Sequence, residues 1–435
     1  MPQNTAIIGA GSSGLTVLKA LREAGVPAVC FERGSKVGGN WVFGNDNQQS
    51  RIYRSLRINT SRERMQFSDF PMPADYPDYA SHEQVARYFE AYAEAFDLKP
   101  GIRFRSTVER VEPSGSAYMV RTNDGQAHRF DAVIVANGHH WDPAFPEPRP
   151  PGHFDGITLH SHHYVSPREP FDLAGRRVVV VGLGNSAVDI ASELGRSGAQ
   201  VALSVRRGAW VLPKHAFGRP IDRPGIIPKR LPAEVKTTIA ELWYRWQVGT
   251  PASYGLPLPD HRLGHAHPTL SDDLLPLLRE GKITAYGAIQ RLDGDRVHFA
   301  GGRSFQADAV VYCTGYHVTF PFFEPAFVSA PDNELPLFLR CFHLEHRGLM
   351  FAGLAQPLGA IMPLVEAQGR LFASYLRGDY ELPDPEEMRE RARREREQVR
   401  RRFVASRRHT MQVDFDGYLE DVARELRAGH RRSGA

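Results

Sequence analysis

The sequence predicts an α/β fold made of two parallel-sheet domains of the same kind, with the second domain inserted into the first. Two observations carry this prediction. A short apolar strand, a glycine-rich turn and a helix follow one another near the N-terminus, and the same order recurs in the middle of the chain. Each helix is followed by another apolar strand, which completes a βαβ unit of parallel strands.

The first copy places small residues after the apolar strand at 6–8. Its turn consists of Gly9, Ala10, Gly11, Ser12, Ser13 and Gly14. Glycines let the backbone approach a pyrophosphate closely, and the amides at the start of the helix attract it. The next strand, at 28–31, ends in Glu32, whose carboxylate can accept hydrogen bonds from both ribose hydroxyls. The adenosine bound here must therefore carry a free 2′-hydroxyl, as in FAD or NAD but not NADP.

The second copy follows the strand at 178–181. Its turn consists of Gly182, Leu183, Gly184, Asn185, Ser186 and Ala187, and the last of these is small enough for close helix–strand packing. The next strand, at 201–205, ends without a carboxylate, and Arg206 and Arg207 follow it. Two guanidiniums with Ser204 nearby can bind a 2′-phosphate, so this copy favours NADP(H). The alternative is that both arginines are ordinary surface charges.

Two further segments define the rest of the chain. The segment at 307–315 echoes the one at 131–138, since each has an aspartate, a buried strand and a glycine turn, and we expect it to mark the return to the first domain. A charged helix is predicted from Asp384 to about Arg402, with Asp384 as its cap and acidic residues before basic ones. A solvated surface helix is the simple interpretation, and a basic face for a membrane or a partner is the alternative.

Composition excludes several classes of protein. The net charge of +4 over 435 residues does not indicate a nucleic-acid-binding protein. Cys30, Cys313 and Cys341 lie far apart, which excludes a disulfide reductase and indicates a reducing compartment. No cysteine or histidine group has metal-ligand spacing, so we expect no metal site. Because the sequence shows neither a signal peptide nor a membrane-spanning apolar run, we expect a cytoplasmic protein that does not bind membranes.

The segment at 154–164 resembles the identifying sequence of the flavin-containing monooxygenases, F-x-G-x-x-x-H-x-x-x-Y/F, and precedes the second glycine turn as it does in that family. The related Baeyer–Villiger monooxygenases end this motif in Trp followed by Pro or Asp. Here Tyr164-Val165 departs from that ending, which favours nitrogen and sulfur oxidation over ketone oxidation. We expect His160 of the motif to pack and hydrogen-bond between the two domains rather than to transfer a proton.

The resemblance extends over nearly the whole chain, at segments 32–41, 58–61, 68–71, 312–316 and 351–363, and the missing apolar tail is typical of soluble bacterial-type members. It implies FAD in the first domain and NADPH in the inserted one. The expected parts are 1–165 and 306–380 for the FAD-binding domain, 166–305 for the NADPH-binding domain, and 381–435 for a charged helical tail. All residues of the two turns except Ala10 and Leu183 are expected to bind the cofactors. The other expected cofactor-binding residues are Glu32, Arg33, Gly39, Asn40, Trp41, Thr60, Val108, Gly138, Ser204, Arg206, Arg207, Gly315 and Gln356.

Asn59 is the one expected catalytic residue. In the family the corresponding asparagine lies beside the flavin and the nicotinamide side of NADP, and an amide can both donate and accept hydrogen bonds. Without the resemblance, an ordinary loop asparagine is the better interpretation.

The resemblance also implies the reaction. NADPH reduces FAD, the reduced flavin forms a C4a-hydroperoxide with O2, and a small amine, sulfide or indole-like substrate takes up one oxygen atom. A homodimer is expected from the size of the enzyme. The alternatives are Baeyer–Villiger oxidation of ketones, an uncoupled NADPH oxidase and a non-catalytic nucleotide-binding regulator.

Overall fold

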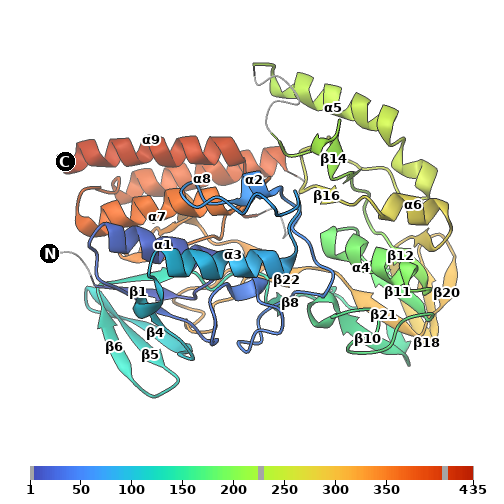
Figure 1. Cartoon of the computed structure of the whole chain (residues 1–435), viewed down its shortest axis with the longest axis horizontal. Coiled ribbons are helices and arrows are strands. Elements are labelled where there is room, and N and C mark those ends of the chain that lie inside the picture. The colour runs from blue at the N-terminus through green and yellow to red at the C-terminus, as the bar shows by residue number, and fades with distance from the viewer. Residues whose placement is uncertain (1–3, 224–229, 404–409, 435) are drawn as a thin grey trace. The chain divides into compact units, whose positions relative to one another are not determined.

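The computed structural model describes residues 4–223, 230–403 and 410–434. The chain divides into two compact units, and Figure 1 labels their elements. The first unit comprises Met1–Ser50, Arg62–Asp142 and His317–Ala435, and the second comprises Arg51–Ser61 and Pro143–Tyr316. Each unit contains a mainly parallel sheet with helices packed against it, so the predicted α/β fold with two Rossmann-like domains is confirmed.

The first unit is built on a seven-stranded sheet in the order β23-β24-β25-β7-β1-β2-β3. Its parallel strands are β25 (Leu349–Phe351), β7 (Ala132–Val135), β1 (Thr5–Ile8), β2 (Ala28–Phe31) and β3 (Ile102–Arg103). The antiparallel edge consists of β23 (Leu337–Phe338) and β24 (Phe342–His343). All residues of β1 and β7 are buried, as expected for central strands of a parallel sheet.

The first unit also contains six α-helices among the described residues. They are α1 (Ser12–Glu23), α2 (Arg62–Met65), α3 (His82–Ala95), α7 (Met362–Arg377), α8 (Pro385–Arg402) and α9 (Phe415–Ser433). Helix α1 packs against α7, and α7 packs against α9; the orange and red helices lie together in Figure 1. The predicted charged helix is confirmed as α8, because Asp384 accepts hydrogen bonds from the Glu386 and Glu387 amides, each at 3.0 Å.

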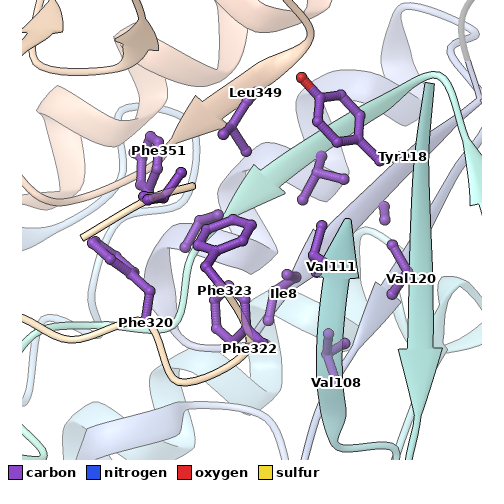
Figure 2. Packing of buried hydrophobic residues seen from close by; sticks show 14 of the residues in the cluster. Ile8, Val108, Val111, Tyr118, Val120, Phe320, Phe322, Phe323, Leu349 and Phe351 are labelled. Carbon is purple, nitrogen blue, oxygen red and sulfur yellow. The ribbon is translucent and has the colours of Figure 1, made fainter. Parts of the chain in front are cut away.

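A second sheet, which is antiparallel, contributes residues to the hydrophobic core of the first unit. It consists of β4 (Val108–Ser114), β5 (Ala117–Thr122) and β6 (Ala127–Phe130). Figure 2 shows Val111 and Val120 of this sheet in one buried cluster with Ile8 of β1 and the phenylalanines around Phe322. This core lies beside the strand that leads into the first glycine turn.

The second unit has a five-stranded parallel sheet in the order β10-β21-β11-β12-β17. The strands are β10 (Ile157–His160), β21 (Ala309–Tyr312), β11 (Arg177–Val181), β12 (Gln200–Ser204) and β17 (Ile283–Tyr286). Its helices are α4 (Asn185–Arg196), α5 (Ala233–Gln247) and α6 (Leu274–Arg279). A smaller sheet contains β20 (Ser304–Gln306), β19 (Arg296–Phe299), β18 (Ile289–Gly294) and β9 (Gly152–Phe154).

Short strands complete the structure. They are β8 (Asp142–Pro143), β13 (Val211–Leu212), β14 (His215–Ala216), β15 (Arg219–Pro220), β16 (Thr269–Leu270), β22 (Tyr316–His317), β26 (Gln356–Pro357) and β27 (Gln412–Val413). Among the described residues, no helix is both long enough and apolar enough to cross a membrane.

The boundaries of the inserted unit differ from the expected ones. Strand β21, which we expected to mark the return to the first domain, pairs with β10 and β11 in the sheet of the second unit, and the chain returns only at His317. The insertion also begins earlier, at Pro143 instead of residue 166, and segment 51–61 belongs to the second unit. The reason is physical: an apolar strand followed by a glycine turn fits either sheet, so its sequence does not specify its partner strand.

Candidate cofactor-binding sites

The first glycine turn, between β1 and α1, has no room for a side chain at Gly9 or Gly14. Gly9 has a φ of +103°, and a Cβ added to it would lie 2.7 Å from the Ala136 carbonyl oxygen. A Cβ on Gly14 would overlap the Gly9 carbonyl oxygen, and a Cβ on Gly39 would lie 3.0 Å from Gly11 Cα. The turn is therefore a cradle lined by main chain, as a pyrophosphate requires.

The N-terminus of α1 faces this cradle, and no side chain of its first turn occupies the free amides. Gly11 is the N-cap, no side chain caps the helix, and its first turn contains no acidic residue. The first amides of the helix, at Ser12, Ser13 and Gly14, therefore carry the partial positive charge that attracts a phosphate group.

Glu32 stands directly after β2 and is only 3% exposed. Its carboxylate accepts hydrogen bonds from the Ala10 amide at 2.7 Å and from the Gly34 amide at 2.8 Å. These contacts fix the carboxylate beside the glycine turn. The oxygen that binds Gly34 also accepts from the Asn47 side-chain nitrogen at 3.5 Å. The other oxygen, which binds Ala10, has a further lone pair and can still accept a hydrogen bond from a ribose hydroxyl.

The other expected FAD-binding residues of this unit play different parts. Residues 39–41 form a short 3-10 helix, and the Gly38 amide next to it donates to the Ala10 carbonyl at 3.0 Å, which places this loop against the first turn. Gly138 has a φ of +73° and open space around it. Val108 is a buried core residue, so only its main chain is available to a ligand. Arg33 is exposed, whereas Asn40, Trp41 and Gln356 are half-buried.

The second turn, between β11 and α4, has the same design with one change. Gly182 has a φ of +126°, and a Cβ added to it would lie 2.8 Å from the Cys313 carbonyl oxygen. Ala187 occupies the position of the third glycine and is fully buried. Gly184 is the N-cap of α4, again with no side-chain cap and no acidic residue in the first helical turn.

Two residues of the second unit that we expected to bind the cofactor, Asn185 and Ser204, use their side chains in hydrogen bonds to the protein main chain. The Asn185 side chain accepts from the Leu270 amide at 2.9 Å and donates to the Pro268 carbonyl at 3.4 Å. The buried Ser204 hydroxyl donates to the Gly287 carbonyl at 3.0 Å. The sequence-based prediction placed the Ser204 hydroxyl beside the arginines as a further donor to the phosphate. In the structure its proton is instead used in the bond to Gly287.

Arg206 and Arg207 follow β12 and are both exposed. Arg207 Nε lies 3.2 Å from an Asp260 carboxylate oxygen, in an ion pair whose partners are about half exposed. This end of the strand therefore carries exposed cations where the first unit has a buried carboxylate.

Segment 51–61, which carries Asn59 and Thr60, is anchored within the second unit. The Tyr53 hydroxyl donates to Asp189 of α4 at 2.6 Å, and the Ser61 amide donates to Asp222 at 2.7 Å. Between these anchors the Asn59 side-chain oxygen is buried and has no hydrogen-bond partner among the described residues. A buried amide oxygen without a partner is costly, which fits a position that a ligand completes.

The motif at 154–164, which includes His160 and Tyr164, lies within the second unit. The His160 ring lies 5.3 Å from that of Phe145 and 5.4 Å from that of Tyr316. Burial lowers the pKa of His160 to about 4, so its imidazole is neutral near neutral pH and serves for packing. The Tyr164 hydroxyl donates to Glu193 of α4 at 3.0 Å.

The sequence analysis missed the two acidic residues of α4 that hold these tyrosines. Asp189 and Glu193 are half-buried and lie one helical turn apart on a helix whose buried residues are apolar except for Ser192. Burial raises the pKa of Asp189 to about 6 and also raises the pKa of Glu193. Two carboxylates on the buried face of a helix require partners, and that signal could have found them.

Within the described residues, no group of three or more histidine, cysteine or acidic side chains could hold a metal ion. The three cysteines, Cys30, Cys313 and Cys341, are free thiols.

Comparisons with known proteins agree with this geometry. The sequence model of the flavin-binding monooxygenase-like family matches residues 2–430. Flavin-containing monooxygenase 5 of Mus musculus is 38% identical over 96% of this chain and 81% of its own length. Dimethylaniline monooxygenase [N-oxide-forming] 2 of Rattus norvegicus is 35% identical over 98% of this chain and 83% of its own length. The solved structure of S-allyl-L-cysteine S-oxygenase from Allium sativum has a TM-score of 0.73 and 27% identity, and the match covers 98% of this chain and 89% of that one.

Proposed function

Because this chain belongs to the flavin-binding monooxygenase-like family and is a monooxygenase that depends on FAD and NADPH, we propose that it oxygenates a nitrogen or sulfur atom of a small molecule. One observation carries the proposal: relatives named for N-oxide formation and for S-oxygenation match 98% of the chain. The Tyr164-Val165 ending of the motif also favours these substrates over ketones.

The first unit supplies the groups that would hold FAD. Gly9, Gly11 and Gly14 leave main-chain space for the pyrophosphate, and the amides of α1 add positive potential. The fixed Glu32 carboxylate suits a ribose with both hydroxyls free. We therefore assign this unit as the FAD-binding domain. When bound, FAD supplies the oxygen-activating chemistry and NADPH supplies the hydride.

The second unit supplies the groups that would hold NADPH. The main chain from Gly182 to Ala187 and the uncapped start of α4 suit its pyrophosphate. Arg206 and Arg207 suit the 2′-phosphate, because they are exposed and no carboxylate follows β12. We therefore assign the second unit as the NADPH-binding domain. In this assignment Ser204 stabilises the fold by its bond to Gly287 and does not bind the 2′-phosphate.

Asn59 would act on the reacting groups through its amide. Its oxygen is buried without a partner between two anchored points of segment 51–61, so it can accept a hydrogen bond from a bound group without first breaking another. Thr60 and Gly315, in the same unit, complete the ligand contacts that we propose there. We also propose that the enzyme is a homodimer and that it acts in the reducing cytoplasm. The free cysteines are consistent with that compartment.

The test is NADPH consumption by the purified yellow holoenzyme in the presence of a tertiary amine, a thioether, indole or a cyclic ketone. We expect an N-oxide or a sulfoxide, identified by mass spectrometry, in proportion to the NADPH consumed. A lactone from the ketone would instead indicate a Baeyer–Villiger enzyme. Hydrogen peroxide equal to the NADPH consumed, with every substrate, would indicate an uncoupled oxidase.

A further inference from the structure

The C-terminal helices have no part in the proposed function, yet α9 is joined to the interior of the first unit by a chain of buried hydrogen bonds. The Gly353 amide donates to the Gln368 side-chain oxygen at 3.0 Å, and the Gln368 nitrogen donates to the Tyr418 hydroxyl at 2.7 Å. That hydroxyl donates to the Leu339 carbonyl at 2.7 Å. Gln368 is 0% exposed, so its amide depends on these partners.

The start of this chain lies against the first glycine turn. Gly353 follows β25 with a φ of +77°, and a Cβ added to it would overlap the Ser13 hydroxyl. The Gly353 main chain therefore packs directly on a residue that we assign to the pyrophosphate of FAD. A shift of Gly353 would change the shape of the cradle.

The same loop is held a second time, a few residues farther along. Strand β26 pairs in parallel with β27, which precedes α9, and the Gln356 amide donates to the Met411 carbonyl at 2.8 Å. Arg340 fixes the start of that segment, because its guanidinium donates to the Thr410 carbonyl at 3.0 Å and to Glu395 of α8 at 2.8 Å. Both C-terminal helices therefore hold the loop at 353–358.

The far end of the hydrogen-bond chain is strained. Leu339 and Arg340 have φ values of +50° and +56°, a region that non-glycine residues rarely adopt. Such a conformation persists only where surrounding contacts determine it. Here those contacts are the Tyr418 hydroxyl on Leu339 and the Arg340 contacts with α8 and Thr410. The helical segment therefore imposes a shape on the domain and does not merely cover it.

We propose that the C-terminal helices are positioning elements of the FAD site, in which Tyr418 acts through Gln368 to hold Gly353 against Ser13. The inference rests on the assignment of FAD to the first glycine turn. It gives segment 381–435 a role in cofactor retention, whereas the sequence alone indicated a solvated surface helix.

The first test is Tyr418→Phe in the full chain, which removes one hydroxyl and keeps the ring. FAD is stripped from the protein, and its dissociation constant is measured by titration of flavin fluorescence. We expect the constant to rise about two- to tenfold, as for the loss of one buried hydrogen bond. The affinity for NADP+ is expected to stay unchanged, because its site lies in the other unit.

Tyr380→Phe is the matched control. The Tyr380 hydroxyl donates to Glu425 of α9 at 3.2 Å, in a buried position, and it makes no hydrogen bond to Gly353, Gln368 or Tyr418 among the described residues. Both variants are expected to lower the melting temperature of the apoprotein by a similar amount, and only Tyr418→Phe is expected to weaken FAD binding. An equal effect of both variants on FAD, or no effect of Tyr418→Phe, would overturn the inference.

A double-mutant cycle tests the route through Gln368. If Tyr418 acts through Gln368, then Tyr418→Phe should add almost nothing to the FAD dissociation constant of a Gln368→Leu variant. Independent, additive effects would refute that route. Failure of the underlying assignment looks different: Gly14→Ala, which closes the first glycine turn, would then leave the FAD affinity unchanged, whatever residue 418 is.

Discussion

The two glycine turns share a backbone design but differ in the residues that give each its nucleotide. In the first turn a third glycine is obligatory, since a Cβ on Gly14 would overlap the Gly9 carbonyl oxygen, whereas the second turn accommodates Ala187. Beyond the turn, the first unit presents a buried carboxylate, Glu32, and the second presents exposed guanidiniums. On the proposed assignment, the turn itself holds the pyrophosphate, and the residue after the next strand selects the ribose.

The helices that follow the turns differ as well. The buried residues of α1 are apolar apart from Thr16 and Lys19. The Thr16 hydroxyl donates to the Ser12 carbonyl within the same helix at 2.7 Å, and the Lys19 ammonium lies 2.7 Å from a carboxylate oxygen of Asp69. The inward face of α4 carries Asp189 and Glu193, which bind Tyr53 and Tyr164 from distant parts of the chain. Both helices thus hold a distant segment through a polar contact, but the contact on α4 joins a carboxyl group to a hydroxyl, whereas the contact on α1 is an ion pair.

The largest effect is expected where the two turns differ by a single Cβ. We expect Gly14→Ala to abolish FAD binding, because the new methyl group collides with main chain that cannot yield without opening the turn. The reciprocal change, Ala187→Gly, only removes a small buried side chain and should retain NADPH-dependent activity. Flavin absorbance of the purified proteins and titration of the apoproteins measure the outcome. A Gly14→Ala protein with a full complement of flavin would contradict the structure of the turn.

The next effect concerns the charges after β12. Replacing Arg206 and Arg207 by alanine should raise KM for NADPH by about ten- to a hundredfold, as expected for the loss of charge-assisted hydrogen bonds to a phosphate. The kinetics with NADH should hardly change, because NADH has no 2′-phosphate. Asp260→Asn is the control, since it only frees Arg207 from its half-exposed ion pair. Equal losses with both cofactors would show that the arginines do not read the phosphate.

A smaller effect is expected at the other nucleotide. In Glu32→Gln one side-chain oxygen becomes an amide nitrogen, which must face the amide of Ala10 or Gly34, so one buried donor loses its acceptor. The dissociation constant of FAD should rise about tenfold, while the affinity for NADP+ stays the same. Unchanged FAD binding in this variant would remove the carboxylate from the ribose site.

What could be predicted from the sequence was local. The strands, both turns, Glu32, the arginines after β12 and the cap at Asp384 are each specified within a few neighbouring residues. The sequence could not assign β21 to its sheet, because an apolar strand carries no mark of its partner. It also missed the Tyr53–Asp189 and Tyr418–Gln368 pairs, which join residues that are distant in the chain. Spacing rules cannot anticipate such contacts.

The smallest effect distinguishes the carboxyl–hydroxyl contact of α4 from the ion pair of α1. Burial raises the pKa of Asp189 from 3.8 to about 6; the Tyr53 hydrogen bond and Lys214 oppose this shift, and Asp273 and Glu193 add to it. A folded-state pKa above the unfolded one favours the protonated form, so stability is highest at low pH and falls as the pH rises through about 6. Asp189→Asn keeps an acceptor for Tyr53 but cannot ionise.

Thermal unfolding of the wild-type protein and of Asp189→Asn at two pH values measures this contribution. We expect the substitution to raise the melting temperature by roughly 2–4 °C at about pH 8, and by less at about pH 5, where the wild-type carboxyl group is already largely protonated. A lower melting temperature at about pH 8 would mean that the ionised carboxylate stabilises the fold. In that case the Tyr53–Asp189 contact on α4 would be stabilised by its charge, like the Lys19–Asp69 ion pair on α1, and the contrast between the two helices would disappear.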